Sequence, residues 1–184
     1  MKTLYKITDT QGLSDRIRSR FDDVKARLVA KRGGDSVYTL FLQVDEPLHS
    51  FETIASGHFF YSPLRTGLGE THREELNSLL DNWKATTKKE LFDWIEKFAR
   101  LNTYEISIPG LKDPNLCPDG KTGLVISFLT EYDLFYKVKQ EGWYDEFMHQ
   151  MEHCVISAVA NSVYPMLKKK ILSSFAFTPL SIES

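Results

Sequence analysis

Cysteine is scarce in this sequence, with only Cys117 and Cys154 among 184 residues. The two lie far apart and form no C-x-x-C motif, so we expect reduced thiols rather than a disulfide framework. Long apolar runs are also missing, and residues 1–5 do not read as the start of a secretion signal. We therefore expect a soluble cytoplasmic protein, with contact at a membrane surface left open.

An excess of charge of one sign is missing too, because 23 Lys and Arg face 25 Asp and Glu. This balance argues against a nucleic acid or an anionic surface as a partner recruited by bulk electrostatics. The chain has 42% hydrophobic, 12% aromatic and 26% charged residues, which is typical of a globular protein. Its length is ample for one domain with a substantial core.

The sequence contains neither G-x-G-x-x-G nor G-x-x-x-x-G-K-[ST]. It therefore has no glycine-rich loop of its own that could bind the phosphates of a dinucleotide or nucleotide. Gly67-Leu68-Gly69 is interpreted as a turn. His149 and His153 have the spacing of metal ligands on one helical face, but a third ligand is not identifiable and Cys154 points elsewhere. We expect a solvated polar face there and no metal.

Cys117, His58 and the lysines at 168–170 could each have a chemical function, but a structural role is the simpler interpretation of each. Cys117 lies in the loop 111–120 near Lys112 and Lys121, where turn structure is favoured over a reactive thiolate. His58 stands among aromatic residues and is expected to be a satisfied, partly buried histidine. The run 168–170 has three lysines, too few to hold a protein on a membrane, and is expected to be a solvated lead into the last strand.

Helical periodicity predicts a first helix capped by Ser14 and ended by Gly33-Gly34. Its apolar stripe is Leu13, Ile17, Phe21, Val24 and Leu28. Further helices are predicted at about 72–83, from about 87, and at 143–163. Strands are predicted at 36–45, 57–63, 103–109, 121–130 and 171–177, the first of them buried on both faces.

The element order predicts an α+β fold with a single mixed β-sheet of about four to six strands and helices mainly on one face. Alternation along the strands separates two faces. The face expected beneath the helices carries Tyr104, Ile106, Ile108, Leu124, Ile126 and Phe128. The opposite face carries Thr39, Phe41, Gln43, Ser107, Val125, Ser127 and Leu129.

Six blocks of sequence follow one another in a distinctive order: 36–45, 57–63, 107–127, 143–147, 164–165 and 177–183. In this order they resemble the phytoene desaturase and retinol saturase group of FAD-dependent oxidoreductases, within the amine-oxidase-like superfamily. The most specific piece is the Asp-Pro-x-Leu-x-Pro-x-Gly-Lys-Thr run at 113–122. The resemblance covers nearly the whole chain, from Met1 to Ser184.

The resemblance implies that residues 1–184 are a single substrate-binding domain, excised from a longer flavoprotein whose FAD-binding domain is absent here. FAD would belong to the full-length protein, and no cofactor-binding residue is expected within this chain. The family acts on carbon–carbon bonds of apolar, carotenoid- or retinoid-like substrates, and the fragment alone is expected to be inactive. No catalytic side chain carries over from the family, and Gln43 stands where family members often have a small residue.

We therefore expect the face with Thr39, Phe41 and their neighbours to line a cavity for an apolar small molecule. The equal alternative is that this face only packs against the missing FAD-binding domain in cis. A different functional class also stays open, namely a free-standing module that binds a ligand or a protein without redox chemistry. In isolation, an exposed apolar face should favour self-association.

Overall fold

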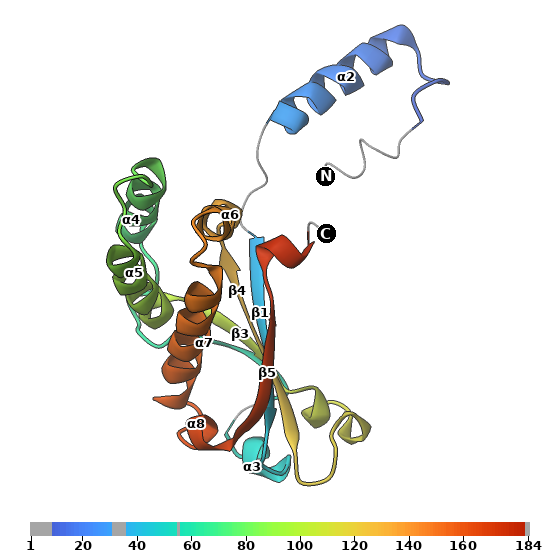
Figure 1. Cartoon of the computed structure of the whole chain (residues 1–184). Coiled ribbons are helices and arrows are strands. Elements are labelled where there is room, and N and C mark those ends of the chain that lie inside the picture. Colours follow the sequence, from blue (N-terminus) through green and yellow to red (C-terminus); the bar gives the residue numbers. More distant parts are fainter. Residues whose placement is uncertain (1–8, 31–35, 55, 183–184) are drawn as a thin grey trace. The chain divides into compact units, whose positions relative to one another are not determined.

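A computed structural model describes residues 9–30, 36–54 and 56–182 of the chain. The chain divides into two compact units, Met1–Gly34 and Asp35–Ser184, each described here by itself (Figure 1). The first unit contains the helix α2 (Asp15–Ala30). The second contains the sheet, its covering helices and both sites discussed below.

The helix predicted for the first unit is confirmed. Ser14 directly precedes α2, and its carbonyl oxygen accepts hydrogen bonds from the backbone N–H groups of Ile17 and Arg18, both at 2.9 Å. The apolar stripe is only partly covered, since Ile17 is 54% exposed. Gly33-Gly34 and the side chain of Leu28 lie outside the described residues.

The second unit is built on one five-stranded sheet of order β2-β3-β4-β1-β5. The strands are β1 (Ser36–Val44), β2 (His58–Tyr61), β3 (Tyr104–Ser107), β4 (Thr122–Thr130) and β5 (Ile171–Phe177). The α+β class and the single sheet are confirmed. All four strand pairings are antiparallel, whereas mixed directions were expected. Helical connections can return a chain in either direction, so element order alone did not fix this.

Helices cover one face of the sheet, where α5 and α7 run alongside it in Figure 1. The helices of this unit are α3 (His49–Glu52), α4 (Glu70–Asp81), α5 (Lys88–Leu101), α6 (Tyr132–Gln140), α7 (Tyr144–Ala160) and α8 (Leu167–Lys170). A capping box fixes the start of α5: the Glu90 N–H donates to Thr87 Oγ1, and the Thr87 N–H donates to the Glu90 carboxylate. No element had been predicted for the stretch that forms α6.

The core lies between the sheet and these helices. All six strand residues predicted to lie beneath the helices are at most 4% exposed. Phe128 links the layers through a ring contact with Phe98 of α5 at 5.7 Å, and within the sheet it contacts Tyr38 at 4.9 Å and Tyr104 at 5.6 Å. The Tyr104 hydroxyl in turn donates to the Ala99 carbonyl of α5 at 2.6 Å. Among the described residues of the second unit, no α-helix packs on the other face of the sheet.

The prediction that residues 36–45 are buried on both faces is wrong. Burial alternates along β1, where Tyr38, Leu40, Leu42 and Val44 are buried. Thr39 and Phe41 between them are only half-buried. The unbroken apolar run had suggested double burial, but here part of the apolar side chains faces outward. β1 is an interior strand, hydrogen-bonded to β4 and β5, and still has one open face.

Candidate functional site

The seven residues predicted to line a substrate cavity all lie on the open face of the sheet, on three adjacent strands. Across β3, β4 and β1, Ser107 is opposite Val125, and Val125 is opposite Phe41. In the next row, Ser127 is opposite Thr39. The remaining members, Gln43 and Leu129, are on the same face by strand alternation. The structure therefore brings the predicted set together.

The polar groups of this face are paired with one another. Thr39 and Ser127 share a hydrogen bond of 3.0 Å between their hydroxyl oxygens. Ser107 donates to the Gly57 carbonyl at 3.4 Å, and Ser173 of β5 donates to Gln43 Oε1 at 3.3 Å. Because these hydroxyl groups already have partners, an apolar molecule can cover them at a smaller desolvation cost than unpaired groups would impose.

An aromatic cluster, which sequence analysis did not find, lies at the β5 side of the open face. Phe41 stacks on Phe175 with ring centroids 4.6 Å apart and planes 4° apart, and Phe177 meets both rings edge-on. Phe175 is 59% exposed and Phe177 is 53% exposed. The spacing of Phe175 and Phe177, two residues apart in a strand, indicates that they share one face. Their contact with Phe41 could not be predicted, because nothing in the sequence shows that β5 is the neighbour of β1.

The opposite side of the open face carries a histidine–carboxylate contact and one exposed ring. His58 Nε2 lies 2.8 Å from Glu105 Oε1, and Phe60 is 68% exposed. His58 is satisfied as expected, but it is exposed rather than partly buried. When Nε2 donates to the carboxylate, Nδ1 is left as a hydrogen-bond acceptor on this face.

The other candidates from the sequence take structural roles. His149 and His153 are exposed on α7, and among the described residues no three His, Cys, Asp or Glu side chains are grouped as metal ligands. Cys154 is buried, and burial raises the pKa of its thiol to about 11, so it stays protonated near neutral pH. Cys117 Sγ packs so closely over Gly110 that a Cβ there would overlap with it.

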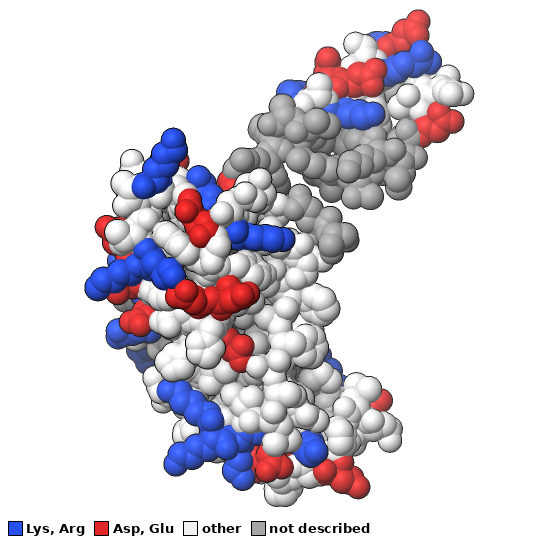
Figure 2. Space-filling view, viewed as in Figure 1, with Lys and Arg blue, Asp and Glu red and all other residues white. Residues whose placement is uncertain are grey.

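The three lysines at 168–170 are not a simple strand lead, because they form most of the short helix α8. Lys168 and Lys169 are exposed as expected, whereas the Lys170 ammonium lies 3.2 Å from the Glu46 carboxylate. Figure 2 shows charged side chains of both signs over the helical side of the second unit. This distribution agrees with the balanced charge of the sequence.

In the part of the chain that the structure describes, every helix is too short or too polar to cross a membrane. Comparison with known proteins found no protein-family model that matches the chain and no curated protein that matches its sequence.

Proposed function

We propose that this chain is the substrate domain of an FAD-dependent oxidoreductase of the phytoene-desaturase type. In this proposal the open sheet face forms one wall of a cavity for an apolar substrate. The observation that carries the proposal is the asymmetry of the sheet, which has a fully packed core on one side and an uncovered apolar surface on the other. The ordered blocks of family-like sequence supply the reaction class.

The composition of the open face supports a ligand or domain that covers it. An antiparallel sheet with one face in water normally alternates apolar and polar residues. Here the outward positions include rings and aliphatic side chains, with Phe60, Leu129 and Phe175 each more than half exposed. Exposed apolar patches of this kind mark sites that bind other molecules. The paired hydroxyls of Thr39 and Ser127 fit an apolar occupant as well.

The residues of the open face do not fit the binding of FAD itself. Its hydroxyls are engaged with one another, and the chain lacks a glycine-rich loop for a pyrophosphate. FAD, held by a separate domain, would supply hydride transfer to or from a carbon–carbon bond. The work of this chain is then to orient the substrate along β1 and β4 and to exclude water.

A protein-binding module is the second candidate, and the β5 edge favours it. β5 pairs only with β1 in the described sheet, so one side of its backbone is free to receive another strand. Phe175 and Phe177 would provide the side-chain contacts. The two candidates differ in which surface is occupied, namely the broad face across β4 or the narrow edge of β5.

Binding of all-trans-retinol, an apolar fluorescent polyene, tests the proposal on the chain itself. We expect Val125→Asp, at the centre of the face, to weaken binding at least about tenfold, because a carboxylate would have to lose its hydration. The matched control is Leu116→Asp, since Leu116 is 62% exposed and lies off the sheet. Equal weakening by both variants would argue against this face as the binding surface.

The gene sequence tests the reaction class. We expect a strand followed by G-x-G-x-x-G upstream of codon 1 in the natural reading frame. A natural protein that starts at Met1 and has no flavin-binding partner domain would overturn the oxidoreductase proposal. Stoichiometric flavin bound to the purified 184-residue chain would contradict the division of labour described above.

A further inference from the structure

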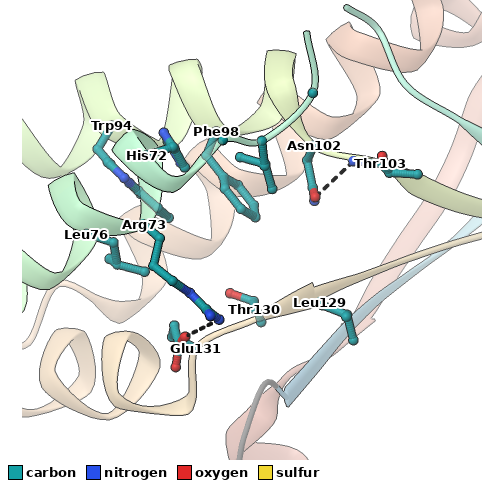
Figure 3. A pocket seen from close by; sticks show the side chains of 13 residues that line it. His72, Arg73, Leu76, Trp94, Phe98, Asn102, Thr103, Leu129, Thr130 and Glu131 are labelled. Carbon is teal, nitrogen blue, oxygen red and sulfur yellow. Dashed lines mark hydrogen bonds and ion pairs between the residues drawn. The ribbon is translucent and has the colours of Figure 1, made fainter. Parts of the chain in front are cut away.

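The second unit contains a cavity of about 580 Å³ between α4, α5 and the end of β4 (Figure 3). This volume lies within the range of small-molecule sites. The lining residues are Gly67, Leu68, Gly69, His72, Arg73, Leu76, Trp94, Phe98, Asn102, Thr103, Leu129, Thr130 and Glu131. Of the seven residues predicted for the open face, only Leu129 belongs to this lining, so the cavity is largely separate from that face.

One wall of the cavity is a stack of three flat rings. The His72 ring stacks on Trp94 with centroids 4.8 Å apart, and it lies 5.6 Å from Phe98. Trp94 and Phe98 stack on each other at 4.9 Å. The three side chains gather on one side of the cavity in Figure 3. Such a wall suits a flat apolar molecule.

Three lining side chains hold nitrogen atoms without a hydrogen-bond partner, although each side chain is more than nine-tenths buried. The atoms are both ring nitrogens of His72, Nε1 of Trp94 and Nδ2 of Asn102. Asn102 Oδ1 accepts the Thr103 backbone N–H at 2.9 Å, which fixes the amide and identifies its NH2 group as the unpaired end. His72 Nδ1 is 3.6 Å from the Glu75 carboxylate, beyond a normal hydrogen bond.

These unpaired atoms are concentrated at the cavity. Among the described residues, eight buried side-chain nitrogen or oxygen atoms lack a partner, and four of them belong to His72, Trp94 and Asn102. Buried polar groups in native proteins are nearly always paired, so such a concentration calls for an explanation. A ligand that supplies a hydrogen-bond acceptor could satisfy the indole N–H or the amide NH2.

The lining has to move before a ligand can contact these atoms, and its loop 67–69 has room to move. The four nitrogens are shielded from water, so a small shift of the lining must accompany binding. Gly67 has a φ of 62°, and a Cβ built on Gly67 or Gly69 would meet no atom within 4 Å. This loop therefore has both conformational freedom and space.

The charged groups at the cavity compensate one another. Arg73 reaches from α4 to Glu131 at 3.4 Å, as Figure 3 shows, and Glu75 beside His72 is paired with Lys97. Burial lowers the pKa of His72 below its ordinary value, and Lys97 lowers it further against the opposing effect of Glu75. The imidazole is therefore neutral near pH 7, and the site offers hydrogen-bond donors without a net charge for an ion.

We propose that this cavity binds a small, neutral, flat apolar molecule that carries a carbonyl oxygen. The ring system of the ligand lies along the aromatic wall, and its oxygen accepts a hydrogen bond from Trp94 Nε1. The site requires neither flavin nor the open sheet face, so it stands or falls independently of the proposed redox function.

A titration of the ¹⁵N-labelled chain with three matched probes tests this site by NMR. The probes are 2-acetylnaphthalene, 2-ethylnaphthalene and 2-naphthoate, which share one ring system and differ in the polar group. We expect 2-acetylnaphthalene to shift the Trp94 indole and Asn102 amide signals. It should bind about 2- to 10-fold more tightly than 2-ethylnaphthalene, as one neutral hydrogen bond contributes. Tightest binding of 2-naphthoate would overturn the neutral ligand class.

Variants of the lining distinguish the roles of its residues. Trp94→Phe keeps an aromatic ring and removes the N–H donor, so it should lower the affinity for the ketone about 2- to 10-fold more than the affinity for the hydrocarbon. Trp143→Phe, outside the lining, is the control. Leu68 is 42% exposed, so Leu68→Trp should fill the cavity without disturbing the core and weaken both naphthalenes. If none of the probes shifts the Trp94 and Asn102 signals, the proposal is wrong.

Discussion

Replacing His72 by Phe should stabilise this protein, which is unusual for a change at a buried residue. The imidazole is 5% exposed and stacked between α4 and α5, and neither ring nitrogen has a hydrogen-bond partner. Phe preserves the stacking on Trp94 and Phe98 and removes both unpaired nitrogens. The cavity beside it can accept the slightly larger ring.

The magnitude follows from the cost of unpaired buried polar groups, about 1–3 kcal/mol each. The Glu75 carboxylate, 3.6 Å from Nδ1, offsets part of this cost in the wild-type protein, so we expect a net gain of about 1–2 kcal/mol in the free energy of unfolding. For a domain of this size that gain corresponds to a rise in Tm of about 2–8 °C. Glu75 keeps its pairing with Lys97 in the variant.

The variant should also change the dependence of stability on pH. Burial holds the pKa of folded His72 below its ordinary value of 6.5. Between 6.5 and that lower pKa the unfolded chain binds a proton that the folded chain does not, so wild-type stability falls as the pH falls through this window. Above pH 6.5 the imidazole is neutral in both the folded and the unfolded chain, so His72 no longer makes stability depend on pH. The advantage of His72→Phe should therefore grow from pH 7.5 toward pH 5.

Urea unfolding at pH 7.5 and pH 5.5, followed by circular dichroism, measures both effects. The matched control is His153→Phe, because His153 is exposed on α7 and should change stability by no more than about 0.5 kcal/mol. A His72→Phe variant less stable than the wild-type protein at pH 7.5 would show that the imidazole nitrogens are paired in solution. That result would refute the reasoning.

The remaining predictions concern the cap, the core, the thiols and the open face. Thr87→Ala should cost about 1 kcal/mol in urea unfolding by removing the capping box of α5, whereas Thr66→Ala in an exposed loop should cost almost nothing. Tyr104→Phe should cost about 0.5–1.5 kcal/mol in the same assay, since it loses the 2.6 Å hydrogen bond to the Ala99 carbonyl. At pH 8 a water-soluble thiol reagent should modify Cys117 well before Cys154, whose pKa burial raises to about 11; equal rates by mass spectrometry would contradict this. The purified chain should self-associate through its open face, and Phe175→Ser should lower the apparent mass in light scattering, unlike Leu116→Ser off the sheet.

Much of the fold could be predicted because its signals are local. The alternation of Tyr104 and Ile106 with Glu105 identified both the strand and its inner face, and the helix predicted from about residue 87 is α5. What could not be predicted depends on pairing between distant segments. The antiparallel directions and the position of β5 beside β1 follow from connections whose path the sequence does not specify.

The same reasoning separates the two sites. The open face was predicted because Phe41 and Val125 occupy outward positions of patterned strands. The cavity was missed because His72 on α4 lies beside Trp94 on α5 only through helix packing. No sequence motif links these residues or Asn102. Gly67-Leu68-Gly69 was interpreted as a turn only, although it forms part of the cavity lining.

The position of β1 between β4 and β5 has a consequence for how this unit acquires its structure. β1 comes first among the described strands, yet its partners are residues 122–130 and 171–177. Its two ladders therefore close long loops, which slows folding and delays completion of the sheet until residue 177 is available. Until those partners are synthesised, the apolar side chains and backbone of β1 stay unpaired. An exposed strand of this kind favours aggregation of the unfinished chain.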